Sequence, residues 1–364
     1  MKVLMFKTPL LVILAVSTLS ACTIAPYKVN LDTNQQEKLN NAQLVVDLSN
    51  KKLGAQYHLY GTSDGTLAAA GVTAGALGGL IVGLTEAAIN ESRETDAEEA
   101  ITKIRELLAG DTLKKAYEKQ YQMLITTLPQ LADNQVKVYD EWPSKGIKTL
   151  GLAPDDTALI LTPEYSLTPD NTMLHVLLQV QLYQGAVKGE KPQLLYQNRF
   201  LYQSKSNPYV DRLRTEEEKQ EYLAKINAKY AKLPDGMRER LREIKKRDKA
   251  LAAVNEPLDE QAFAAKQAKT WLADNGQPLR QYLEEGVQEV FNMFAYDVAE
   301  QTDFTQGKVF PIAFRSFSNT SGERRWYRLG DNFSKGIMLS LNSNDFFRGT
   351  KTAQGQVIVA PLRQ

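Results

Sequence analysis

Three consecutive segments between residues 158 and 204 alternate apolar and polar side chains, and this pattern limits the fold more than any other feature of the chain. They read ALILTPEYSLT (158–168), MLHVLLQVQLYQG (173–185) and QLLYQNRFLYQS (193–204). A period of two places successive side chains on opposite faces of a strand. Turn-like links, Pro169-Asp170-Asn171 and Lys188-Gly189-Glu190, separate the segments. The pattern therefore predicts an antiparallel meander with one buried face.

A long apolar helix is expected to cover this sheet. From about Asp259 to Gln301 the spacing predicts a helix or helix pair with a broad apolar face. That face contains Trp271, Leu272, Leu279, Tyr282, Leu283, Val287, Val290, Phe291, Phe294 and Val298. A further strand is expected in VKVYDEW (136–142), and residues 131–301 are assigned to one body, followed by a β-rich segment over 302–364. Together these elements predict an α+β fold, an antiparallel sheet meander with packed amphipathic helices.

Residues 212–255 differ from their surroundings because they are dense in Glu, Lys and Arg. Apolar residues recur there at helical spacing on both sides of the turn Pro234-Asp235-Gly236. They are Leu223, Ile226, Tyr230, Leu233, Met237, Leu241 and Ile244. The pattern predicts a helical hairpin with a thin apolar seam, inserted in the body. The charges are interpreted as a solvated face, and a binding role for the basic stretch RERLREIKKRDK is the alternative.

Glycine recurs at every fourth position in the stretch GTLAAAGVTAGALGGLIVGL (65–84), within a helical region assigned to 42–130. On a helix, Gly71, Gly75, Gly79 and Gly83 lie near one stripe, where a second helix can approach closely. The uncharged residues 65–85 would span about 31 Å as a helix, enough for a hydrocarbon core. Three interpretations stay open: a zipper helix in or on a membrane, a zipper packed inside the soluble fold, or a flexible segment.

The chain opens with MKVLMFKTPLLVILAVSTLSAC, which has the form of a bacterial secretory signal over residues 1–21. Lys2 and Lys7 precede an apolar core, and Cys22 is the only cysteine of the 364 residues. Residues 22–41 are interpreted as a polar tether. Without residues 1–21 the formal net charge changes from +1 to −1, because two lysines are lost. A nearly neutral chain has no electrostatic footprint for nucleic acid.

The residues before Cys22 carry a resemblance. Leu19-Ser20-Ala21-Cys22 resembles the lipobox of bacterial lipoproteins. In lipoproteins that match it, the cysteine becomes the first residue of the mature chain and carries a diacylglycerol and an N-acyl group. In enterobacterial lipoproteins an Asp after the cysteine favours inner-membrane retention, and Thr23 stands there, so the resemblance implies an outer-membrane location facing the periplasm. The alternative is an ordinary signal with a chance cysteine.

The body carries a second resemblance. Its order, a sheet meander followed by a Trp-led amphipathic helix, resembles periplasmic lipoprotein domains of the TolB N-terminal and CsgG/LpoB-like class over about 136–300. The N-terminal part resembles the glycine-zipper lipoproteins of proteobacteria. Such relatives scaffold, activate a partner enzyme or build secretion pores, and most are not enzymes. The resemblance therefore implies protein partners in the envelope and a possible homo-oligomer.

One catalytic pattern matches by its letters. Gly61-Thr62-Ser63-Asp64-Gly65 is a G-x-S-x-G sequence between a strand-like run and a helix, the context of a hydrolase nucleophile elbow. The base would be His58 or His175, and the chain order Ser63, Asp155 or Asp156, His175 is allowed. Only two short strands precede Ser63, however, and no glycine-rich oxyanion loop does. The stretch is more simply interpreted as a turn with Ser63 or Asp64 capping the next helix.

No other chemistry is indicated. The two histidines and the lone cysteine give no convincing metal site, and the chain has neither a P-loop nor a G-x-G-x-x-G loop, so no cofactor is expected. We therefore expect a non-enzymatic envelope protein, bound to membrane lipid through acylated Cys22, with a periplasmic body for protein–protein interaction. A subunit of an oligomeric outer-membrane pore or secretion assembly is the alternative. A serine esterase using the Gly61–Gly65 turn is a remote one.

Overall fold

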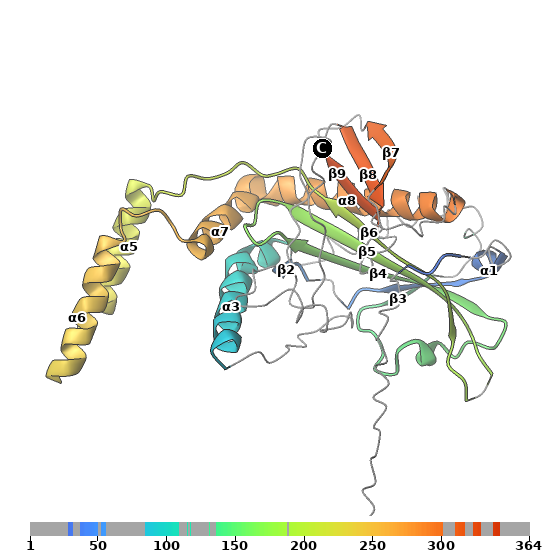
Figure 1. The fold of residues 1–364 in the computed structure, drawn as a ribbon, viewed down its shortest axis with the longest axis horizontal. Helices are drawn as coiled ribbons and strands as arrows, with labels where there is room; N and C mark the ends of the chain where they lie inside the picture. Colours follow the sequence, from blue (N-terminus) through green and yellow to red (C-terminus); the bar gives the residue numbers. More distant parts are fainter. Residues whose placement is uncertain are drawn as a thin grey trace, which may run out of the picture.

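The computed structural model describes residues 28–31, 37–49, 52–55, 84–108, 115, 117, 131, 136–187, 189–300, 310–316, 323–328 and 338–342. Several predicted features lie outside these described residues: Cys22, the zipper glycines Gly71, Gly75, Gly79 and Gly83, and the Gly61–Gly65 turn with Ser63 and His58. The described chain combines helices with one mixed sheet, so the predicted α+β class is confirmed (Figure 1).

The sheet follows the order β3-β1-β4-β5-β6-β9-β8-β7 within the described residues. The short strand β2 lies off this path and pairs with β4. Its strands are β1 (Gln43–Asp47), β2 (Gly54–Ala55), β3 (Val136–Tyr139), β4 (Thr157–Leu167), β5 (Leu174–Gln184), β6 (Gln193–Gln203), β7 (Phe310–Ser316), β8 (Glu323–Arg328) and β9 (Met338–Asn342).

The centre of the sheet is the predicted meander. Strands β4, β5 and β6 pair antiparallel in chain order, with Leu161 opposite Val180 and Val180 opposite Asn198. The complete sheet is nevertheless mixed, because β1 joins β4 in parallel and β9 joins β6 in parallel. Parallel neighbours need long crossover connections. Those connections run through distant parts of the chain, which the local alternation of the meander does not encode.

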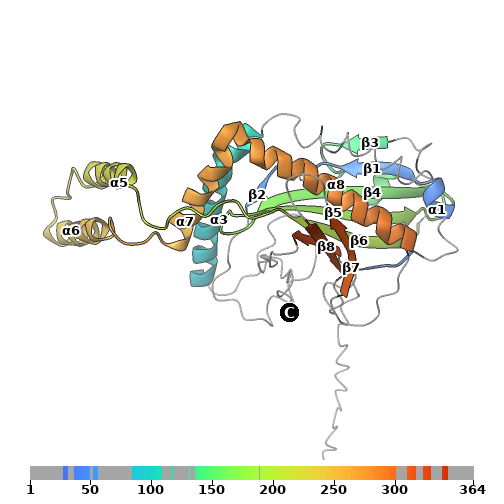
Figure 2. The ribbon, with the colours of Figure 1, turned by 90° about the horizontal axis from the view of Figure 1, so that it is seen from above.

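Helix α8 (Gln277–Glu300) covers one face of the meander and contacts β5, β6 and β9 (Figure 2). Alternate residues of the central strands meet it, among them Val176, Phe200 and Tyr202, all fully buried. The predicted helix pair is present, because α7 (Glu260–Ala268) and the 3-10 segment η4 (Lys269–Gly276) precede α8. A kink separates them, with Asp274 and Asn275 in the left-handed region.

Helix α3 (Leu84–Leu107) packs against α7 and η4. It lies within the predicted helical region 42–130 and begins at the last residue of the glycine stretch 65–84. Gly276 permits the contact with η4, because a Cβ there would lie only 2.2 Å from Cδ2 of Leu107. Gly276 also has a φ of +74°, which glycine adopts without strain.

Helices α5 (Glu216–Lys229) and α6 (Met237–Ala252) contact each other and stand away from the sheet (Figures 1 and 2). A complete capping box begins α5 at Thr215. The expected seam is only partly buried. Ile226 is enclosed, but Met237 and Leu241 remain 81% and 55% exposed, because two helices alone cannot cover both sides of a seam. Whether 212–255 behaves as a dispensable insertion stays a prediction.

The described residues of the expected tether lie against the body. Val29 forms an antiparallel bridge with Gln197 of β6, and Leu31 is buried. Helix α1 (Glu37–Asn40) buries Leu39. The part of 22–41 that could act as a free tether is therefore shorter than its polar composition suggests.

The described strands of the β-rich segment predicted over 302–364 join the sheet of the body, because β9 pairs with β6 and β8 with β9. Residues 338–342 are all buried. The described part of 302–364 thus completes the same core.

Gly286 provides a test of how closely α8 packs. A Cβ at this position would lie 2.6 Å from Cγ2 of Val176 and 2.7 Å from Cδ1 of Tyr202, two buried side chains. Alanine is better than glycine in a helix by about 1 kcal/mol. We expect Gly286→Ala to lower the free energy of unfolding nevertheless, by about 1–3 kcal/mol, because overpacking outweighs propensity.

Chemical denaturation measures this change. Glu284→Ala, at an exposed position of the same helix, is the control and should be nearly neutral. A Gly286→Ala protein that is more stable than the wild type would show that α8 does not approach the sheet this closely.

Candidate functional site

The face of α8 that meets the sheet carries three buried carboxylates, Glu285, Glu289 and Asp297. Their spacing of four and eight residues places them along one side of the helix. A buried carboxylate is tolerated only when charged or hydrogen-bonding partners compensate for its lost hydration. The partners here come from strands and segments that are far away in the sequence.

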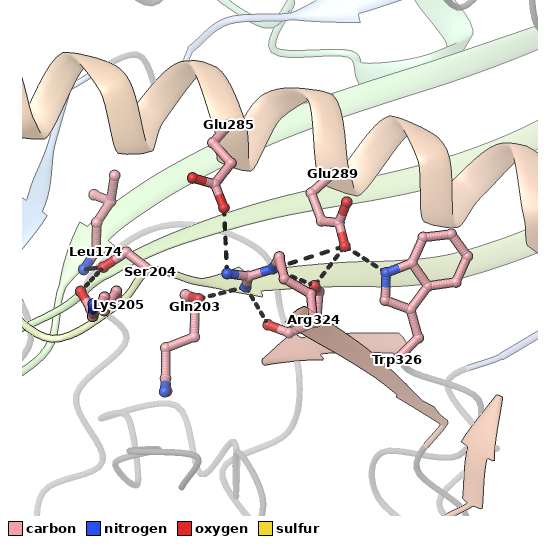
Figure 3. Close-up of polar contacts among 9 residues, drawn as sticks. Leu174, Gln203, Ser204, Lys205, Glu285, Glu289, Arg324 and Trp326 are labelled. Atoms are coloured by element: carbon pink, nitrogen blue, oxygen red, sulfur yellow. Dashed lines mark hydrogen bonds and ion pairs between the residues drawn. The ribbon is translucent and has the colours of Figure 1, made fainter. Parts of the chain in front are cut away.

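Arg324 of β8 supplies the cation for the first two carboxylates (Figure 3). Its Nη1 lies 3.4 Å from Oε1 of Glu285, and its Nε lies 3.9 Å from Oε1 of Glu289. The guanidinium also donates to Oγ of Ser340 at 3.0 Å, and Nη2 donates to the carbonyl oxygens of Gln203 and Ser340 at 2.6 and 3.0 Å. Arg324 is thereby bound to β6, β9 and α8 at once.

Glu289 is held by two further donors. Nε1 of Trp326 and Oγ of Ser340 both donate to its Oε1, the latter at 2.6 Å. The Arg324 guanidinium lies 4.2 Å from the centre of the Tyr202 ring. Burial raises the pKa of Tyr202 well above its ordinary value, although the charge of Arg324 opposes this. The cluster therefore combines one cation, two carboxylates and two aromatic rings in a water-excluded layer between α8 and the sheet.

Asp297 forms the second end of this layer. Its carboxylate accepts from Nζ of Lys28 at 2.6 Å, from the hydroxyl of Tyr196 at 2.8 Å and from Nδ2 of Asn198 at 2.9 Å. Both members of the ion pair are almost completely enclosed, with side-chain exposures of 8% and 0%. This pair fastens the N-terminal segment to the C-terminal half of α8.

These groups are arranged to bind segments of the chain itself. The partners of these carboxylates described above are protein groups from the N-terminal and C-terminal segments and from the meander. Within the described ranges, no group of three or more His, Cys, Asp or Glu residues could hold a metal ion. In the same ranges, no helix is both long and apolar enough to cross a bilayer.

The hydrolase candidates that the structure describes do not come together. His175 lies on β5 opposite Ser166, whereas Asp155 and Asp156 precede β4 at the end where Thr157 pairs with Gln184. The two ends of these strands are about 30 Å apart. Asp155 and Asp156 therefore cannot share a catalytic triad with His175, and the predicted set Ser63, Asp155 or Asp156, His175 is wrong. An esterase that uses Ser63 with His58 lies outside the described residues and stays a prediction.

His175 has a structural environment. Its side chain is buried, and Nε2 lies 3.2 Å from Oε1 of Gln203. Burial lowers the pKa of His175 to about 4, although the hydrogen bond with Gln203 and the charge of Asp170 oppose the shift. The imidazole is consequently neutral at neutral pH.

Sequence reasoning missed the carboxylates of α8 and their partners Lys28 and Arg324. The available signal was an acidic residue at positions 285, 289 and 297, beside the apolar stripe of a helix that was expected to be buried. Charged residues on such a face require partners. The sequence could not identify which of its many lysines and arginines would supply them.

The neutral state of His175 gives a pH dependence. An unfolded histidine has a pKa of about 6.5, so the unfolded chain binds this proton more tightly than the folded chain does. Stability should therefore decline as the pH falls from about 6.5 to about 4, by up to about 3 kcal/mol from this residue.

Unfolding free energies measured across that range for the wild type and for His175→Gln test the assignment. The decline should be shallower in the variant. His58→Gln, at the other histidine of the chain, is the control. Equal pH profiles for wild type and His175→Gln would refute the assignment.

Comparisons with known proteins complete this picture. No protein-family model matches the chain, and neither the curated proteins nor the solved structures contain a match. The resemblance of the body to TolB N-terminal and CsgG/LpoB-like domains therefore stays a prediction from patterning.

Proposed function

We propose that this chain is a non-enzymatic protein of the bacterial cell envelope, anchored in the outer membrane through acylated Cys22, whose α+β body binds protein partners in the periplasm. The lipobox-like sequence Leu19-Ser20-Ala21-Cys22 supports the anchor, as does the absence of any other cysteine from the sequence. A single acyl chain binds a protein to a membrane only marginally, and stable anchoring needs more than one. A diacylglycerol and an N-acyl group on Cys22 would therefore anchor the protein stably.

One structural observation carries the proposal further: Lys28 is locked to Asp297 in a buried ion pair. Lys28 follows Cys22 by six positions, and a chain of that length spans at most about 20 Å. An acylated Cys22 would therefore keep the C-terminal half of α8 close to the membrane surface. The body would lie close to the bilayer, because only a short linker would separate it from the acylated cysteine.

The glycine stretch and the helical hairpin belong to this proposal. A zipper through Gly71, Gly75, Gly79 and Gly83 would give the anchored protein a helix-packing surface, on the membrane or against its own helices. The hairpin α5–α6 would be an insertion that projects from the body. A non-enzymatic role agrees with the separation of Asp155 and Asp156 from His175.

The test compares the precursor, Cys22→Ser and the conservative control Thr23→Ser in a Gram-negative host. Mass spectrometry of the mature N-terminus should find Cys22 with a diacylglycerol and an N-acyl group in the wild type and in the control. Cys22→Ser should be unmodified and should leave the membrane fraction. Thr23→Asp should keep the acyl groups and move the protein towards the inner membrane.

A mature chain that starts elsewhere, or a free thiol at Cys22, would contradict the proposal. Carbonate-resistant membrane binding by Cys22→Ser would instead assign the anchoring to the glycine stretch. A large, uniform oligomer of the wild type in mild detergent would favour the pore or secretion-assembly alternative.

A further inference from the structure

The two helices of the hairpin carry opposite charge. Helix α6 has seven basic and three acidic residues, whereas α5 has four acidic and three basic ones. Among the described residues, the cations of α6 that form ion pairs are Lys246, with Glu243, and Arg247, with Asp248. Most of the positive charge of α6 is therefore available to an external partner.

The charge and the apolar side chains of α6 share one side of the helix. The partly shielded residues Glu243, Ile244, Arg247 and Ala250 mark the side nearer to α5. At about 100° per residue, Met237 and Leu241 lie on the neighbouring open side. Their exposures of 81% and 55% agree with this placement.

Four exposed cations continue this open side beyond Met237 and Leu241. They are Arg238, Arg242, Lys245 and Lys249. These six residues are called the open face of α6 below. Glu239 and Glu243 project away from it at the same angular step. The third acidic residue of α6, Asp248, lies between Met237 and Leu241, and its charge is paired with Arg247 at 3.0 Å. The open face is thus an apolar edge, with one paired carboxylate, followed by a row of cations.

The root of the hairpin is fixed to the body. Nη1 of Arg214 donates to the carbonyl of Ala253 at 2.9 Å, just past the end of α6. The amide of Leu258 donates to the carbonyl of Arg212 at 2.9 Å. Nζ of Lys266 on α7 lies 2.7 Å from Oε2 of Glu218 on α5. These contacts hold both ends of the hairpin, so the open face has a defined direction relative to the body.

We propose that the open face of α6 docks on an anionic phospholipid surface. Its cations contact phosphate headgroups, and Met237 and Leu241 enter the boundary between headgroups and acyl chains. Basic helices with an apolar edge bind membranes in this way, through apolar burial together with attraction to anionic lipid. An acidic protein surface would satisfy the cations, but it would not require Met237 and Leu241 beside them.

This inference rests on the proposed envelope location, which puts a bilayer within reach. Lys28 contacts the C-terminal half of α8, whereas the hairpin joins through α7 before the N-terminal end of α8. The 24 residues of α8 give it a length of about 36 Å. Contacts at its two ends would lay the body along the membrane.

Vesicle sedimentation tests the docking without the lipid anchor. The mature chain from residue 22, carrying Cys22→Ser, should bind phosphatidylcholine vesicles that contain phosphatidylglycerol and should not bind pure phosphatidylcholine vesicles. Each cation contributes roughly fivefold to binding on an anionic surface, so Arg238→Gln with Arg242→Gln should weaken binding about 25-fold. Met237→Ser with Leu241→Ser should weaken it at unchanged charge.

The matched control is Lys145→Gln with Lys148→Gln, at exposed positions of the body around η3 (Gly146–Leu150). This control makes the same change of charge and should bind as the parent chain does. Thermal unfolding of every variant shows whether it is folded. An unfolded variant is replaced by its single substitutions.

A label at the open face gives an independent reading. Leu241→Cys in the Cys22→Ser chain creates a single thiol for a polarity-sensitive dye. Its emission should shift to the blue with phosphatidylglycerol vesicles, whereas a dye at Lys148→Cys should not respond.

Equal binding to both vesicle types, or variants that bind like the parent, would overturn the proposal, as would a dye that stays in water. Because the chain tested has no acyl group, failure here and failure of Cys22 acylation are distinguishable.

Discussion

The buried carboxylates of α8 impose a requirement that the rest of the chain must meet. A carboxylate removed from water is destabilising by several kcal/mol unless cations and donors compensate. Arg324, Trp326 and Ser340 from the C-terminal strands meet this requirement at Glu285 and Glu289. Lys28 meets it at Asp297, across 269 positions of sequence. The two ends of the described chain are thus connected to one helix by electrostatics as well as by packing.

The meander and α8 could be predicted because their signals are local. Alternation in β4, β5 and β6 and the apolar stripe of α8 each lie within one element, and burial of those faces follows directly. The parallel additions of β1 and β9 could not be predicted, since they depend on crossovers between distant segments. The ion pairs of Lys28 with Asp297 and of Arg324 with Glu285 could not be predicted either, because their partners are also far apart in the sequence. Predictions about Cys22 and the zipper glycines lie outside the described residues and stay predictions.

The structure changes the picture of how an anchored form would be arranged. A long polar linker would let the body move freely above a membrane. Lys28, however, forms an ion pair with α8, and Val29 forms a β-bridge with β6, so the linker is short. If the open face of α6 docks on lipid as proposed, an acylated chain would have a second point of attachment, beyond the N-terminal end of α8. The sheet and α8 would then separate the two points of attachment. The close packing of α8 on the sheet at Gly286 holds these two elements together.

A double-mutant cycle on Lys28 and Asp297 tests this account most directly. Unfolding free energies would be measured for Lys28→Met, Asp297→Asn, the double variant and Lys52→Met, an exposed control. The account predicts that Lys28→Met costs about 3 kcal/mol or more, because it leaves a buried carboxylate without its cation. It also predicts that the double variant costs less than the sum of the two single ones, by about 1–3 kcal/mol. Additive effects, with Lys28→Met as mild as Lys52→Met, would contradict the claim that α8 holds the N-terminal segment.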